Sequence, residues 1–122
     1  MRINKIKLTK DASERLKQLK ARTGLTPNIL SRIGFCLSLS EPAIPDPKQF
    51  PEEDREFNRY TLLGEWDDLY VALLVQRLAT DHLPTAELED QFRAHLNRGV
   101  IALSRLVKNV ADVVRLSEGA IA

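Results

Sequence analysis

The sequence contains few of the residues that small catalytic and redox sites use. One cysteine and two histidines occur among its 122 residues, so the chain has no internal disulfide and no cysteine–histidine zinc cluster. Cys36 lies among apolar residues at helical spacing, which favours a buried, unreactive thiol over a nucleophile. His82 and His95 have no histidine partner four residues away, and we expect neither a metal site nor a catalytic site.

Glycine and long apolar runs are scarce as well. The five glycines are isolated, and none is followed by the Gly-Lys-Thr or Gly-Lys-Ser of a phosphate-binding loop, so we expect no nucleotide and no other cofactor. The longest apolar run, residues 69–75, is about a third of the roughly 20 residues that a membrane span needs. No apolar segment follows the N-terminal basic residues as in a secretory signal, and we expect a cytoplasmic protein.

The rest of the composition is that of an ordinary folded protein. Hydrophobic residues make up 43% and charged residues 29% of the chain, well away from the composition of disordered sequences. The length suits one compact domain, mainly α-helical, with a short N-terminal strand and about five helices. Within it we distinguish a basic strand-helix-helix unit (1–40), a Pro-rich and acidic loop (41–56), a helical part (57–116) and a tail (117–122).

The basic unit is predicted from changes in apolar spacing. Residues 2–8 carry β-branched side chains with some alternation, which indicates a short strand. From Thr9 onward Ala12, Leu16 and Leu19 recur at helical spacing. Two N-caps are compatible with this start, Thr9 itself or a capping pair of Asp11 and Glu14.

The turn that follows has strong local signals. Gly24 accepts the left-handed conformation in which helices often end, so it closes the first helix after Thr23. Thr26-Pro27 opens the second helix, because threonine caps free amides and proline lacks one. Apolar residues continue this helix to Leu37, interrupted only by Gly34.

The second half reads as a loop and further helices. Four of the six prolines fall within residues 42–51, which excludes a helix interior there. Residues 52–68 are acidic, and 69–79 predict a largely buried helix. After a break at Leu83-Pro84, a helix begins near Leu88 that Gly99 ends or kinks, and a last helix covers 100–114. Residues 69–75 and 100–114 offer more apolar surface than one small chain covers, which predicts self-association.

The net charge of +1 hides a strong asymmetry along the chain. Residues 1–32 hold nine basic and two acidic residues, a net +7, and the remainder is −6. Such polarity indicates an anionic partner, although a solvated helix face explains a run of lysines too. In the first reading DNA phosphates are bound by Lys5, Lys7, Lys10, Lys17, Lys20, Arg22, Thr26 and Asn28, with Gly24 as the structural turn between the helices.

The order of strand, helix, turn and helix resembles ribbon-helix-helix proteins, in which two chains pair their strands and present them to DNA. In that arrangement the start of the second helix, here residues 26–28, points its amides at a phosphate. The strand departs from the pattern, because Lys5 and Lys7 suit phosphates better than base edges. Reading of a specific sequence is therefore not expected.

Over its whole length the chain resembles the DndE family, the small subunits of bacterial DNA phosphorothioation systems. The stretches that carry the resemblance are residues 5–8, 22–28, 30–39 and 57–64, the Pro-rich loop, and the last helix from near Gly99. The resemblance implies a homo-oligomer, a tetramer, that binds double-stranded DNA and favours nicked duplex. It also implies ATPase and reductase-like sulfur-transfer subunits as partners, with a cysteine desulfurase supplying the sulfur.

Other functions fit parts of the sequence. A ribbon-helix-helix repressor or antitoxin would use the acidic C-terminal part to hold a protein partner. A structural adaptor would not touch DNA at all. A nuclease would hold Mg²⁺ on the acids at 52–54 or 67–68, for which a solvated acidic surface is the simpler explanation. We expect a DNA-binding subunit without catalytic activity of its own.

Overall fold

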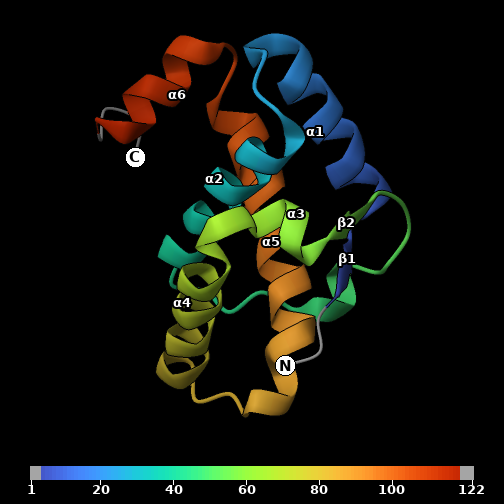
Figure 1. The fold of residues 1–122 in the computed structure, drawn as a ribbon, viewed down its shortest axis with the longest axis vertical. Helices are drawn as coiled ribbons and strands as arrows, with labels where there is room; N and C mark the ends of the chain where they lie inside the picture. Colours follow the sequence, from blue (N-terminus) through green and yellow to red (C-terminus); the bar gives the residue numbers. More distant parts are fainter. Residues whose placement is uncertain (1–3, 119–122) are drawn as a thin grey trace.

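Figure 1 shows the computed structural model, which describes residues 4–118. The fold is mainly α-helical with a short N-terminal strand, as predicted; the second strand at residues 56–58, where the sequence predicts the end of a loop and the start of a helical part, is not predicted. Most of the predicted tail and the start of the predicted N-terminal strand lie outside the described residues. Its elements are β1 (Lys5–Lys7), α1 (Lys10–Thr23), α2 (Pro27–Ser40), η1 (Pro47–Gln49), β2 (Glu56–Asn58), α3 (Arg59–Leu63), η2 (Gly64–Trp66), α4 (Asp67–Thr80), η3 (Thr85–Glu87), α5 (Leu88–Leu106) and α6 (Val110–Ser117).

The N-terminal helices begin and end where their local signals predict. Thr9, rather than the Asp11 and Glu14 pair, caps α1 by accepting a hydrogen bond of 3.0 Å from the Ala12 amide. Gly24 ends this helix in the left-handed region, with φ of 76°. Thr26 caps α2, and Pro27 is its first residue. These boundaries are set by neighbouring residues alone, which is why the sequence predicts them well.

The long helix α5 runs through the middle of the molecule, with α2 and α1 packed against it (Figure 1). The prediction that Gly99 ends this helix is wrong, because α5 continues through it to Leu106, and the alternative of a kink at Gly99 stays a prediction. A Cβ on Gly99 would lie 1.8 Å from the carbonyl oxygen of Gly34, so the two glycines let the backbones of α5 and α2 cross in contact. The break comes later instead, because Asn109 caps a separate helix α6 by accepting from the Asp112 amide.

The strand β1 is paired within the chain. It lies antiparallel to β2, with Ile6 opposite Phe57, and the buried Asn97 of α5 binds its other edge. The side-chain oxygen of Asn97 accepts from the Thr9 amide at 2.8 Å, and its amide donates to the Lys7 carbonyl at 3.3 Å. The ribbon-helix-helix resemblance thus extends to the order of the elements, while β1 pairs with β2 of its own chain and gives its Lys7 carbonyl to Asn97.

Helix α4 is more exposed than its apolar sequence predicts. Leu74 and Leu78 face the core, whereas Leu69, Leu73 and Val75 are 52%, 40% and 43% exposed. The helix lies at the edge of the molecule (Figure 1) and only one of its sides meets the rest of the fold. The expectation of a largely buried helix is therefore wrong for a single chain. None of the helices between residues 4 and 118 is long and apolar enough to cross a membrane.

Candidate nucleic-acid interface

The predicted basic residues fall into two groups at opposite ends of α1. The far end consists of the last turns of α1, the turn at Gly24 and the start of α2, and the near end consists of β1 and the first turn of α1. In Figure 1 the near end lies beside β2, which pairs with β1, and α1 runs from there to the top of the molecule. The structure therefore does not bring all the predicted residues into one patch.

The far end carries exposed, uncompensated positive charge. Lys17, Lys20 and Arg22 are exposed, and none of the three makes an ion pair with a described residue. Lys20 and Arg22 lie in the last turn of α1, where positive side chains interact favourably with the helix dipole. Three cations here are free to meet an external anion.

The start of α2 adds hydrogen-bond donors to the far end. Pro27 has no amide, and the amide of Ile29 is taken by the Thr26 hydroxyl oxygen at 3.3 Å. The hydroxyl of Thr26 keeps its own hydrogen for a further acceptor. Among the described residues the Asn28 amide has no acceptor, so this helix start offers one amide and one hydroxyl to a phosphate.

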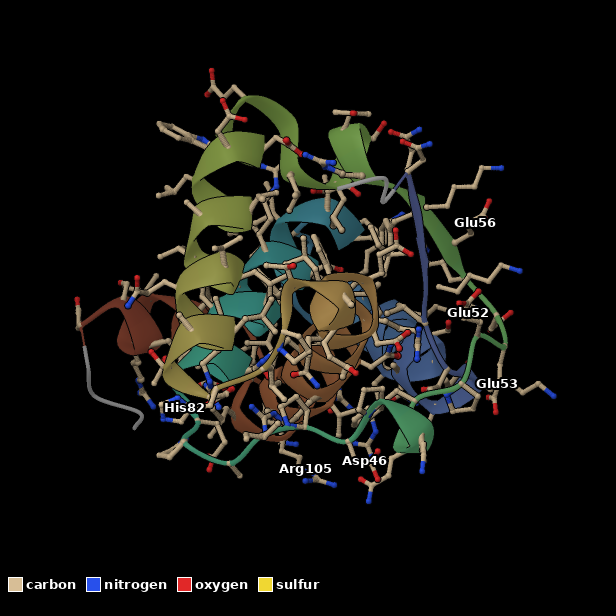
Figure 2. All side chains as sticks on the ribbon, turned by 90° about the horizontal axis from the view of Figure 1, so that it is seen from below. Asp46, Glu52, Glu53, Glu56, His82 and Arg105 are labelled. Carbon is tan, nitrogen blue, oxygen red and sulfur yellow. The ribbon has the colours of Figure 1, made fainter. Side chains whose placement is uncertain are left out.

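The near end lies beside an acidic segment. Lys5 and Lys10 are exposed and Lys7 is partly buried. We call residues 52–56 the acidic segment; Glu52 and Glu53 lead toward β2, whose first residue is Glu56 (Figure 2). Three lysines and Asp11 on one side face four acids and Arg55 on the other, so the charge of the near end is locally balanced. The sequence reasoning missed this compensation because the two segments are more than 40 residues apart.

A second polar cluster lies between α2 and α5. The Nδ1 atom of His95 lies 2.8 Å from the Ser38 hydroxyl, which also accepts from Arg98 at 2.8 Å. Burial, with Arg98 and Arg77 nearby, lowers the pKa of His95 from 6.5 to about 4. Arg77 and Arg98 donate to backbone carbonyls at the end of α2 and in the following loop. Ser38, His95 and Arg77 are buried and Arg98 is partly buried, and the cluster holds the Pro-rich loop on the core.

The cysteine is placed differently from the prediction. Cys36 is exposed, because the apolar stripe of α2 is wider than the strip that α5 covers, and Ile29 on the same side is also 40% exposed. Partial desolvation by its neighbours raises the pKa of the Cys36 thiol, which disfavours the reactive thiolate. No group of three or more metal-binding side chains occurs within residues 4–118.

One protein family matches almost the whole described chain. The sequence model of the family described as DNA sulphur modification protein DndE matches residues 5–110. The chain belongs to the DndE family. No curated protein matches the chain.

Crystal structures of DndE proteins have a similar fold. DndE from Escherichia coli B7A, described as involved in DNA phosphorothioation modification, is 28% identical to this chain with a TM-score of 0.68. The similarity covers 84% of this chain and 98% of that one. A DndE mutant with glycines replaced by lysine is 25% identical, with a TM-score of 0.67 over 84% of this chain and 99% of the other. Helix α6 begins where the family match ends.

Proposed function

We propose that this chain is a DNA-binding accessory subunit of DNA phosphorothioation that holds duplex DNA, preferentially nicked duplex, through its far end. Membership in the DndE family ties the chain to DNA sulfur modification. The observation that supports the DNA contact is the group of exposed, unpaired cations Lys17, Lys20 and Arg22 next to the free donors of Thr26 and Asn28. Phosphate is the DNA group that such donors bind.

The proposed contact is indifferent to base sequence. Lysine, arginine and helix-start amides position a duplex by its phosphates and carry no direct sequence information. A base-reading ribbon of two paired chains needs a free strand edge; β2 covers one edge of β1, and Asn97 takes the Lys7 carbonyl on the other edge. This disfavours a ribbon-helix-helix repressor that recognises one operator.

Several copies are needed for useful affinity, and we propose a homo-oligomer, a tetramer as the family resemblance implies. Exposed apolar residues on α2, α4 and α6 would be covered by the oligomer. They are Ile29, Leu69, Leu73, Val75, Val110 and Val114, each 40% or more exposed.

Light scattering should detect a multimer, and Leu69→Glu/Leu73→Glu should reduce the multimer to smaller species. A monodisperse wild-type monomer at micromolar concentration would contradict this part of the proposal.

The sulfur chemistry is proposed to belong to the ATPase, the reductase-like sulfur-transfer subunit and the cysteine desulfurase. The raised pKa of Cys36 and the closed Ser38–His95 contact support this division of labour. The purified chain should leave duplex DNA intact in the presence of Mg²⁺. Cleavage that Asp67→Asn or Glu53→Gln abolishes would identify a nuclease instead.

The test of the proposal is a comparison of nicked, intact and single-stranded DNA of one sequence over roughly 50–200 mM salt. We expect the tightest binding to nicked duplex, and a log–log salt slope of about −0.9 for each phosphate contact on duplex DNA. A second duplex of unrelated sequence should bind equally. Binding confined to one sequence, or no binding at the lowest salt, would overturn the proposal.

A further inference from the structure

The acidic segment is tied to the near end by hydrogen bonds at both of its sides. The Leu8 amide donates to the Arg55 carbonyl at 2.8 Å, and the Asp54 amide donates to the Leu8 carbonyl at 3.0 Å. The Arg55 amide donates to the hydroxyl of Ser13 in α1 at 3.2 Å. The segment is thus held in register along β1 and the first turn of α1, rather than hanging free in solvent.

Glu53 occupies the anion position at the start of α1. Its Oε2 atom accepts a hydrogen bond of 3.0 Å from the amide of Lys10, the first residue of this 14-residue helix. Helix starts bind phosphates through such free amides and through the positive end of the helix dipole. A carboxylate of the chain itself therefore stands where an external phosphate would bind.

The neighbouring glutamates engage further cations. Glu56 lies opposite Lys7 in the β1–β2 pairing, and its carboxylate is 3.7 Å from the Nζ atom of Lys5. The carboxylate of Glu52 is 3.6 Å from Arg93 of α5, which also donates to the Phe50 carbonyl at 2.8 Å. Three glutamates of one segment thus face three different cationic or amide groups at or beside the near end.

We propose that the acidic segment is a built-in phosphate mimic that screens the near end from DNA and confines duplex contact to the far end. The inference rests on the proposed DNA-binding function. It adds that the near end does not bind DNA and that the acidic segment prevents this binding. The segment also repels approaching phosphates, because Glu52 and Glu56 keep 60% and 41% of their side-chain surface exposed. Neutralising it would open a second contact area on the same chain.

The test uses the full chain with Glu52→Gln/Glu53→Gln/Glu56→Gln. Glutamine keeps an oxygen for the Lys10 amide, so the charge is removed while the hydrogen bond remains available. The matched control is Glu65→Gln/Glu89→Gln/Glu118→Gln, which changes the net charge equally at exposed positions outside the acidic segment. Nicked and intact duplex are titrated over the same salt series, and thermal unfolding checks that each variant folds. Should the triple variant unfold, Glu56→Gln alone replaces it.

The inference predicts about ten-fold tighter binding for the segment variant, since exposed charge pairs act by a few-fold each, and a steeper salt slope from the added phosphate contacts. The control should change affinity by less than about three-fold. Equal gains in both variants would overturn the inference in favour of net charge. If the wild type binds DNA and the segment variant has the same affinity, the inference is overturned and the proposed function is unaffected. Binding by the segment variant alone would overturn the far-end contact of the proposed function and, with it, the inference that duplex contact is confined to the far end. Absence of binding in every form would overturn both as well.

Discussion

The near and far ends of the basic unit carry the same number of basic side chains in different surroundings. Each presents three basic side chains, Lys5, Lys7 and Lys10 at one end and Lys17, Lys20 and Arg22 at the other. At the near end the acidic segment lies beside the lysines: Glu56 forms an ion pair with Lys5, and Glu53 accepts from the backbone amide of Lys10. At the far end none of the three basic side chains makes an ion pair with a described residue. The difference shows that basic residues counted along a sequence form an anion-binding surface only where the fold places no carboxylates beside them.

The largest expected effect is structural and belongs to the near end. Asn97→Ala removes the hydrogen bonds to the Thr9 amide and the Lys7 carbonyl from a fully buried position. Leaving the buried Thr9 amide and the partly buried Lys7 carbonyl without this partner should lower the free energy of unfolding by about 3 kcal/mol, measured by urea denaturation. Asn28→Ala at the far end is the matched control and should cost less than about 1 kcal/mol. Equal losses would remove the distinction between the two ends.

The next effect comes from a contact between α2, which begins at the far end, and α5, which binds the near end through Asn97. His95 on α5 contacts Ser38 on α2, and its surroundings include Arg77, Arg98 and Asp81. Its folded pKa of about 4 lies below the ordinary value of 6.5, so the unfolded chain binds the proton more tightly. The stabilisation is fully present above about pH 6.5 and is lost as the pH falls toward 4, in total about 3 kcal/mol.

Urea denaturation at several pH values checks this dependence. His95→Gln, which keeps a polar group without titrating, should have a flatter stability profile between pH 4 and 6.5. His95 lies outside the far end, so DNA binding should be lost over this range only as the chain unfolds. A wild-type profile as flat as that of the variant would contradict the assigned environment of His95.

The smallest effect concerns the turn at the far end. Gly24→Ala should cost about 1 kcal/mol, because φ is 76° and nothing lies within 4 Å of an added Cβ, so only the backbone conformation resists. Gly24→Asn should cost less, since asparagine tolerates this region. Gly24→Lys should match the alanine variant in thermal stability while binding duplex slightly more tightly. A loss well above 2 kcal/mol for Gly24→Ala would contradict the open surroundings of Gly24 in this turn.

What the sequence predicts well is decided by neighbouring residues. Thr9, Gly24 and Thr26-Pro27 mark helix ends through hydrogen bonds and backbone conformations that span a few residues, and the structure confirms those boundaries. The family resemblance, read from stretches spread along the chain, is confirmed by the match over residues 5–110.

What the sequence does not predict depends on distant segments. Three contacts join residues more than 40 positions apart: the pairing of β1 with β2, the contact of Gly34 with Gly99, and the hydrogen bond from the Lys10 amide to the Glu53 carboxylate. The exposure of apolar residues on α4 is not predicted either, because apolar periodicity identifies an apolar helix face but does not indicate whether the same chain covers it. The division of the basic residues into two ends follows from such contacts and needs the structure.

The most direct test of the account compares Lys17→Ala/Lys20→Ala/Arg22→Ala with Lys5→Ala/Lys7→Ala/Lys10→Ala on one nicked duplex over roughly 50–200 mM salt. Both variants lose three positive charges, so only the location differs. The far-end variant should bind at least about ten-fold more weakly, with a log–log salt slope flatter by about 3. The near-end variant should stay within about three-fold of the wild type. A near-end loss equal to or larger than the far-end loss would contradict the account.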